Sequence, residues 1–177
     1  MAQQRAISIN RAPVLTLWAA VVAERLGFER DTALTLGRAV AGLNAYAKGV
    51  SLGLFEPSSK ALDEHLKKAK AGATLKVDLL NRAVPVVRTP AGLRALSKDR
   101  PISSASVERY LQGKFGEDLG SARRAMEELA HSLPPREIAA HAYHLYEQFR
   151  PDIPPGVRGW GAAGKLDLDR IAALGKQ

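Results

Sequence analysis

The strongest pattern along the chain is a pair of helical stretches near its beginning. Residues 13–26 (PVLTLWAAVVAERL) are apolar on nearly every side of a helical wheel, and residues 31–48 repeat Leu36, Val40 and Leu43 at helical spacing. A helix that is apolar all round has to be covered by other helices. The pattern therefore predicts two helices folded back on each other at the centre of a structural core.

The second of these helices carries a row of small residues four positions apart. Ala33, Gly37 and Ala41 form this row. Small side chains let another helix approach closely, in a membrane dimer as well as inside a folded domain. We expect a tight internal crossing against the first helix.

The pattern changes to period two at residues 74–89. Leu75, Val77 and Leu79 alternate with polar residues, as in a half-buried strand. A turn at 81–82 and a second extended run at 84–87 predict a short hairpin. Pro85 lies within the second run, and because proline cannot donate to a ladder, that run is expected at a sheet edge.

The remaining chain reads as helices separated by polar, proline-rich or glycine-rich segments. Helices are expected at 59–71, 105–114, 121–132, 134–149 and from 167, with one helical turn at 90–96. Residues 1–12 are expected to fray, 50–58 to pack down as a strap, and 151–166 to be a loop packed on the domain. The predicted fold is mainly α: a single domain over residues 1–177, with six or seven helices and one short β-hairpin near 74–89.

Composition narrows the class of protein. The chain has no cysteine, which excludes disulfides and thiolate metal sites and suits a reducing compartment. The N-terminal residues contain no apolar run typical of a signal peptide. The most apolar stretch, residues 14–23, is shorter than the roughly 20 residues that a membrane span requires. We expect a cytoplasmic protein with no membrane partner.

Charge is the most informative global property. The net charge is +8, and residues 60–114 contain twelve basic and five acidic side chains. The flanking parts of the chain are close to neutral by comparison. An excess of this kind favours a polyanionic partner, although it also aids solubility with no ligand at all.

The basic middle gives the leading hypothesis, which is binding of DNA or RNA mainly through phosphate contacts. A helix at 59–71 followed by a hairpin is similar in element order, and in nothing else, to a winged helix, in which a recognition helix precedes a wing. The candidate nucleic-acid-binding residues are Lys67, Lys68, Lys70, Lys76, Arg82, Arg88, Arg94, Lys98 and Arg100.

Three observations count against this hypothesis, the first being that the helix at 31–48 is long for the scaffold of a winged helix. Asp63 and Glu64 lie one helical turn from Lys67 and Lys68, which reduces the free charge of that helix. In addition, no aromatic residue occurs between positions 56 and 109, so this segment offers no ring on which a base could stack.

Two alternatives remain open. A protein–protein or homo-oligomerisation module would use Trp160 and an exposed Phe55 in the 50–58 loop as anchors. An enzyme with a helical-cleft active site would need titratable groups in a pocket, and Glu137, His141 and His144 share one helical stripe. That spacing can also present metal ligands, but the stripe lies off the apolar face. No nucleophile, Walker or dinucleotide motif is present, so we expect no catalytic residues, metal or cofactor.

Overall fold

The computed structural model describes residues 6–51, 75–80, 82–97, 100–151 and 163–175. In chain order the elements are β1 Ala6–Asn10, α1 Arg11–Arg25, α2 Arg30–Ser51, β2 Leu75–Leu79, β3 Arg82–Thr89, β4 Gly92–Ser97, β5 Arg100–Pro101, α4 Ser104–Phe115, the 3-10 helix η1 Gly116–Asp118, α5 Leu119–His131, α6 Pro135–Phe149, β6 Ala163–Asp167 and α7 Leu168–Gly175.

The predicted fold class is wrong in its β content. In the described residues, six strands form two antiparallel sheets, one with the order β1-β6 and the other with the order β2-β3-β4-β5. A six- or seven-helix domain with a single hairpin does not describe this arrangement. The expected helix at 59–71 and strap at 50–58 lie outside the described residues, apart from the end of α2, which runs on to Ser51.

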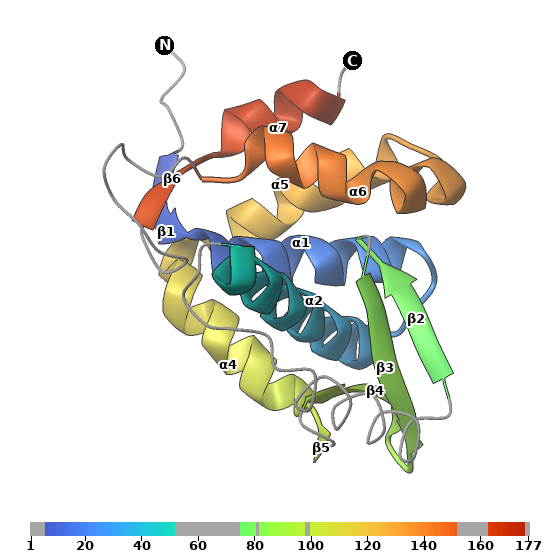
Figure 1. Cartoon of the computed structure of the whole chain (residues 1–177). Coiled ribbons are helices and arrows are strands. Elements are labelled where there is room, and N and C mark those ends of the chain that lie inside the picture. The colour runs from blue at the N-terminus through green and yellow to red at the C-terminus, as the bar shows by residue number, and fades with distance from the viewer. Residues whose placement is uncertain (1–5, 52–74, 81, 98–99, 152–162, 176–177) are drawn as a thin grey trace.

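Helix α1 occupies the centre of the molecule, as the sequence predicts. Every residue from Pro13 to Ala23 is buried, with Trp18 and Leu17 at zero exposure. Helices α2, α4, α5 and α6 all contact α1, and Figure 1 shows it between α2 and the group formed by α5, α6 and α7. Polar groups on this buried stretch would have no water to bind, which explains why it is almost entirely apolar and why the hydroxyl of Thr16 bonds within the helix, to the carbonyl of Ala12.

The close crossing of α1 and α2 is confirmed. A Cβ atom added at Gly37 would lie 2.3 Å from the carbonyl oxygen of Thr16 and 3.0 Å from the backbone nitrogen of Ala20. Both distances are shorter than van der Waals contact. Only a glycine therefore allows the two helix backbones to meet as they do.

On its other side α1 is tied to α5 and α6 by side-chain hydrogen bonds. The indole Nε1 of Trp18 donates to the carbonyl of Ala142 at 2.9 Å, and its ring meets Phe149 edge-on with centroids 5.3 Å apart. The guanidinium of Arg25 donates to the carbonyls of Ala130 and Leu133 at 3.3 and 3.2 Å. Arg25 thereby satisfies one carbonyl in the last turn of α5 and one in the segment that follows it.

Residues 6–10, expected to fray, instead form β1 and pair with β6. The register places Ile7 opposite Leu166 and Ile9 opposite Gly164. Ile7, Ile9 and Leu166 are all buried. The strand therefore forms because its isoleucines reach the core. Part of the expected 151–166 loop is consequently β6, and residues 152–162, with Trp160, lie outside the described ranges.

The expected hairpin exists as β2 and β3 but belongs to a larger sheet. Gly92–Ser97, expected as part of a helical turn, pairs with β3 as β4. Strand β3 is consequently an interior strand, which contradicts its expected edge position. Pro85 is accommodated because it pairs with Lys76 of β2 and lies beyond the β4 register, which ends at Val86 opposite Ala95.

Two helix starts agree with the sequence. The hydroxyl of Ser103 accepts from the backbone N–H of Ser106 at 3.3 Å, and a carboxylate oxygen of Asp167 accepts from the N–H of Asp169 at 2.9 Å. None of the helices in the described ranges combines the length and apolar character needed to cross a bilayer.

Candidate functional site

The nine basic residues predicted to bind nucleic acid divide into two groups. Lys67, Lys68, Lys70 and Lys98 lie outside the described residues. The other five lie on the four-stranded sheet: Lys76 on β2, Arg82 and Arg88 on β3, Arg94 on β4 and Arg100 on β5. Whether these five cations form one surface therefore depends on their positions in the sheet.

The register of the sheet separates three of them. Arg82 and Arg88 alternate in phase with the buried Val84, while Lys76 is paired with Pro85 on the opposite face. Arg82 and Arg88 are six residues apart on one strand, roughly 20 Å at 3.4 Å per residue. These side chains do not gather into one patch, although Lys76, Arg88 and Arg100 are each exposed.

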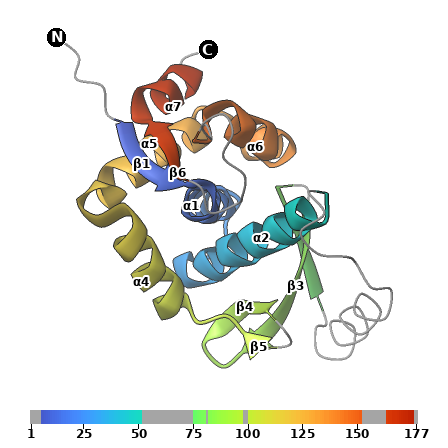
Figure 2. The ribbon, with the colours of Figure 1, turned by 60° about the vertical axis from the view of Figure 1, so that its left-hand side comes forward.

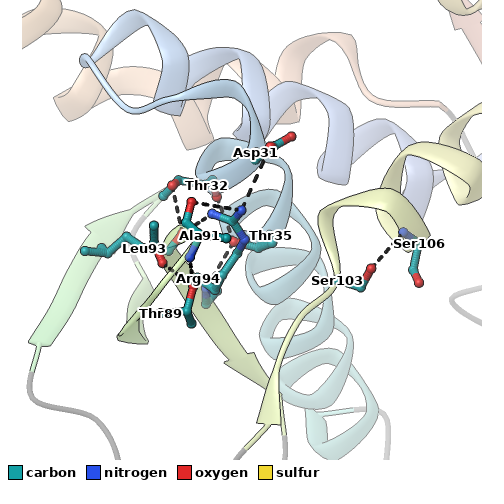
Figure 3. Close-up of polar contacts among 11 residues, drawn as sticks. Asp31, Thr32, Thr35, Thr89, Ala91, Leu93, Arg94, Ser103 and Ser106 are labelled. Carbon is teal, nitrogen blue, oxygen red and sulfur yellow. Dashed lines mark hydrogen bonds and ion pairs between the residues drawn. The ribbon is translucent and has the colours of Figure 1, made fainter.

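Arg94 is turned inward and takes part in the packing. It is only 9% exposed, and its guanidinium donates to the carbonyls of Leu93 at 2.8 Å and Ala91 at 3.5 Å. A carboxylate oxygen of Asp31 in α2 lies 3.9 Å away. Figure 3 shows this arginine between the β3–β4 turn and the start of α2. The guanidinium of Arg94 therefore links the β3–β4 turn to Asp31 at the start of α2.

Two threonines of α2 complete this attachment. The hydroxyl of Thr32 donates to the carbonyl of Leu93 at 2.7 Å, and the hydroxyl of Thr35 accepts from the N–H of Ala95 at 3.0 Å (Figure 3). These backbone groups of β4 do not take part in its hydrogen bonds with β3. The threonines thus cover the open edge of β4 and fix the sheet against α2.

A second group of cations lies on α2 and α4, with Tyr110 of α4 among them. Figure 2 shows α4 beside the first half of α2, and the Arg38 guanidinium of α2 lies over the Tyr110 ring, 5.5 Å from its centroid. Lys114 follows Tyr110 by one helical turn. The Arg109 guanidinium donates to the hydroxyl of Ser106, one turn before Tyr110, at 3.3 Å. We refer to Arg38, Arg109, Tyr110 and Lys114 as the Tyr110 cluster.

The cations of the Tyr110 cluster are exposed and form no ion pair among the described residues. Arg38, Arg109 and Lys114 are exposed, and none of them forms an ion pair with a carboxylate in the described part of the chain. Glu108, the acidic residue nearest to the cluster within α4, bonds instead to Arg30 at 3.1 Å. The three cations are therefore exposed without an ion-pair partner among the described residues, although the exposed Glu117 and Asp118 follow Lys114 by about one turn.

Tyr110 itself is half-buried. Burial raises the pKa of its phenol, and the nearby Arg38 charge opposes this shift. The ring therefore stays neutral at physiological pH. A neutral ring supporting an exposed guanidinium is an arrangement that stabilises both side chains by about 0.5–1 kcal/mol at an exposed site.

Sequence reasoning missed this cluster for an identifiable reason. Arg38 precedes the basic segment and Tyr110 follows the stretch that lacks aromatic residues, so no window of sequence contains both. They meet only because α2 and α4 pack together. Tyr110, near the end of the basic segment 60–114, is the one signal that the sequence offers.

The histidine stripe of α6 does not form a site in the described structure. Glu137, His141 and His144 are all exposed, and the amide nitrogen of Gln148 lies 2.7 Å from Nε2 of His144. Across the ranges that are described, no three His, Asp or Glu side chains are grouped to hold a metal ion. The anchors of the oligomerisation alternative, Phe55 and Trp160, fall outside those ranges.

Comparison with protein-family models, curated proteins and solved structures finds no match to this chain.

Proposed function

We propose that this protein binds nucleic acid through phosphate contacts, as a cytoplasmic, non-catalytic protein. The observation that carries the proposal is the Tyr110 cluster, in which Arg38 lies over the Tyr110 ring and all three cations are exposed, with no carboxylate partner among the described residues. Its setting supports the same ligand, because residues 60–114 hold most of the excess positive charge. Phosphate contacts supply most of the affinity in such complexes.

Lys76, Arg88 and Arg100 take a secondary part in this proposal. They are exposed but spread over different strands and faces, so each adds to the general positive potential. Arg94 is excluded from contact with the ligand by its burial. Binding of this kind depends weakly on base sequence, because phosphates carry no sequence information.

A salt titration tests the proposal. Fluorescence anisotropy of a labelled oligonucleotide is measured with the full chain between about 50 and 200 mM salt, where phosphate-driven binding weakens steeply. We expect binding at the lower concentration and a linear fall of log affinity with log salt. Absence of binding at low salt, or an affinity that does not change with salt, would refute the proposal.

A further inference from the structure

The Tyr110 cluster also indicates whether the nucleic acid is single-stranded or double-stranded. Cations alone bind phosphates of single strands and duplexes alike. The distinguishing feature here is the Arg38 guanidinium, a planar group held over an aromatic ring. Planar groups of both kinds serve as stacking surfaces for unpaired bases in complexes with single strands.

The surroundings of Arg38 leave this plane accessible. Arg38 is exposed, and the residue one turn further along α2 is the exposed Gly42. A Cβ atom added at Gly42 would have Nη1 of Arg38 as its nearest neighbour, at 4.0 Å. No side chain at that position competes for the space beside the guanidinium.

The second requirement is a path for the backbone next to the stacked base. Lys114 lies one turn after Tyr110 on α4, and Arg109 is joined to Ser106, one turn before it. Cations therefore flank the Arg38–Tyr110 pair in both directions along α4. Successive phosphates of an extended strand could be neutralised on each side of a base that stacks on the pair.

A duplex cannot use this arrangement. Its bases are stacked on each other and present only their edges in the grooves. The cluster has no loop or strand that would insert the Arg38–Tyr110 pair between base pairs, because both residues lie within helices packed on the core.

We propose that the Arg38–Tyr110 pair is a base-stacking platform, so that the ligand is single-stranded nucleic acid. This inference rests on the proposed function and narrows it. RNA and single-stranded DNA share the required chemistry, namely an exposed base face next to a phosphate.

The test compares variants of the full chain by fluorescence anisotropy. The probes are single-stranded oligo-dT and oligo-U of about 15 nucleotides, within the range bound by single-strand proteins, and a DNA duplex of equal length. Tyr110→Leu keeps an apolar side chain but removes the ring, and Tyr110→Phe keeps the ring. Arg38→Lys keeps the charge but removes the plane, and Arg136→Lys, on the exposed surface of α6, is its matched control.

We expect both single strands, or one of them, to bind at least ten-fold more tightly than the duplex. Tyr110→Leu and Arg38→Lys should weaken that binding about 5- to 100-fold with the salt slope unchanged, the range typical of one lost stacking contact. Tyr110→Phe and Arg136→Lys should bind like the wild type. Preference for oligo-U or oligo-dT identifies RNA or DNA as the ligand.

Two outcomes would overturn the inference separately from the proposed function. Equal, salt-dependent binding of duplex and single strands would refute the single-strand assignment and leave phosphate binding intact. Unchanged affinity in Arg38→Lys, whose exposed side chain does not endanger folding, would refute the platform. Failure of every probe to bind the wild type would refute the proposed function itself.

Discussion

Gly37 is the residue at which the two central helices come closest. Its missing side chain leaves the Thr16 carbonyl of α1 almost in contact with the backbone of α2. This contact is made by rigid backbone on both helices. A larger residue can be accommodated only by moving the helices apart, which would disturb the packing of α2 against α1.

Gly37→Ala should destabilise the protein by about 3 kcal/mol, because the added methyl overpacks the crossing. Urea unfolding followed by circular dichroism measures the change. Gly113→Ala is the control: it adds the same methyl to helix α4, where nothing lies within 4 Å. There alanine should stabilise by up to about 1 kcal/mol. Similar effects at the two sites would contradict the close crossing.

Tyr146 shows the cost of a buried polar atom. Its side chain is fully buried against Phe149, and its hydroxyl has no hydrogen-bond partner in the described structure. Burial is the main cause that raises the pKa of this phenol well above its ordinary value of 10.0, while the Arg150 and Arg11 charges oppose the shift. The folded state therefore holds the phenolic proton more tightly than the unfolded state.

Tyr146→Phe should leave stability at neutral pH unchanged or raise it by about 1 kcal/mol, because the hydroxyl that is removed makes no bond. The pH dependence has a definite sign. Above pH 10 the unfolded chain loses the Tyr146 proton and the folded chain keeps it, so wild-type stability falls with rising pH. Urea unfolding at pH 8 and pH 11 should show a smaller fall in Tyr146→Phe. A fall as large as in the wild type would contradict this account.

At the scale of elements, the attachment of β4 to α2 positions the four-stranded sheet. The strand is held by side chains of a helix because β5 pairs only with its last two residues. Thr32 and Thr35 take the place of a neighbouring strand. The arrangement also fixes the sheet, and hence its exposed cations, relative to α2.

Thr35→Val should destabilise the protein by about 2 kcal/mol, because it leaves the buried N–H of Ala95 without an acceptor while preserving side-chain shape. Amide hydrogen exchange should show loss of protection at Ala95. Thr16→Val is the matched control. Among the described residues, the hydroxyl of Thr16 bonds only to the carbonyl of Ala12 within its own helix, so its loss should cost less than about 1 kcal/mol. Full protection of Ala95 in Thr35→Val would exclude the proposed role.

The elements differ in how far the sequence predicts them. Helix α1, its crossing with α2 and the β2–β3 hairpin depend on local periodicity and were predicted. Strand β4 was not predicted. Its ladder partner is β3, and its free edge bonds to threonine side chains of α2, so it depends on contacts that local periodicity does not show. The β1–β6 pairing joins the beginning of the chain to its end. A five-residue strand gives too little pattern for such a distant pairing to be recognised.

For the whole molecule, the count of charges along the sequence did not predict which cations lie near one another in the fold. Strand alternation places Lys76 on the face opposite to Arg82 and Arg88, six residues separate these two arginines along β3, and burial removes Arg94. Helix packing instead brings Arg38 to Tyr110. A charge count cannot anticipate either effect, because both depend on which faces of distant elements meet.

The central claim is that the Tyr110 cluster neutralises phosphates, and a comparison of two triple variants tests it most directly. Arg38→Gln, Arg109→Gln and Lys114→Gln together remove the cations of the cluster. Arg124→Gln, Arg136→Gln and Lys165→Gln remove the same charge from exposed positions on α5, α6 and β6.

The measurement is the salt dependence of oligo-dT and oligo-U binding by anisotropy. We expect the first triple variant to lower the log–log slope by about 2, since each single-strand phosphate contact contributes about 0.7. The second should keep the wild-type slope. Equal slopes for the two triple variants would contradict the claim.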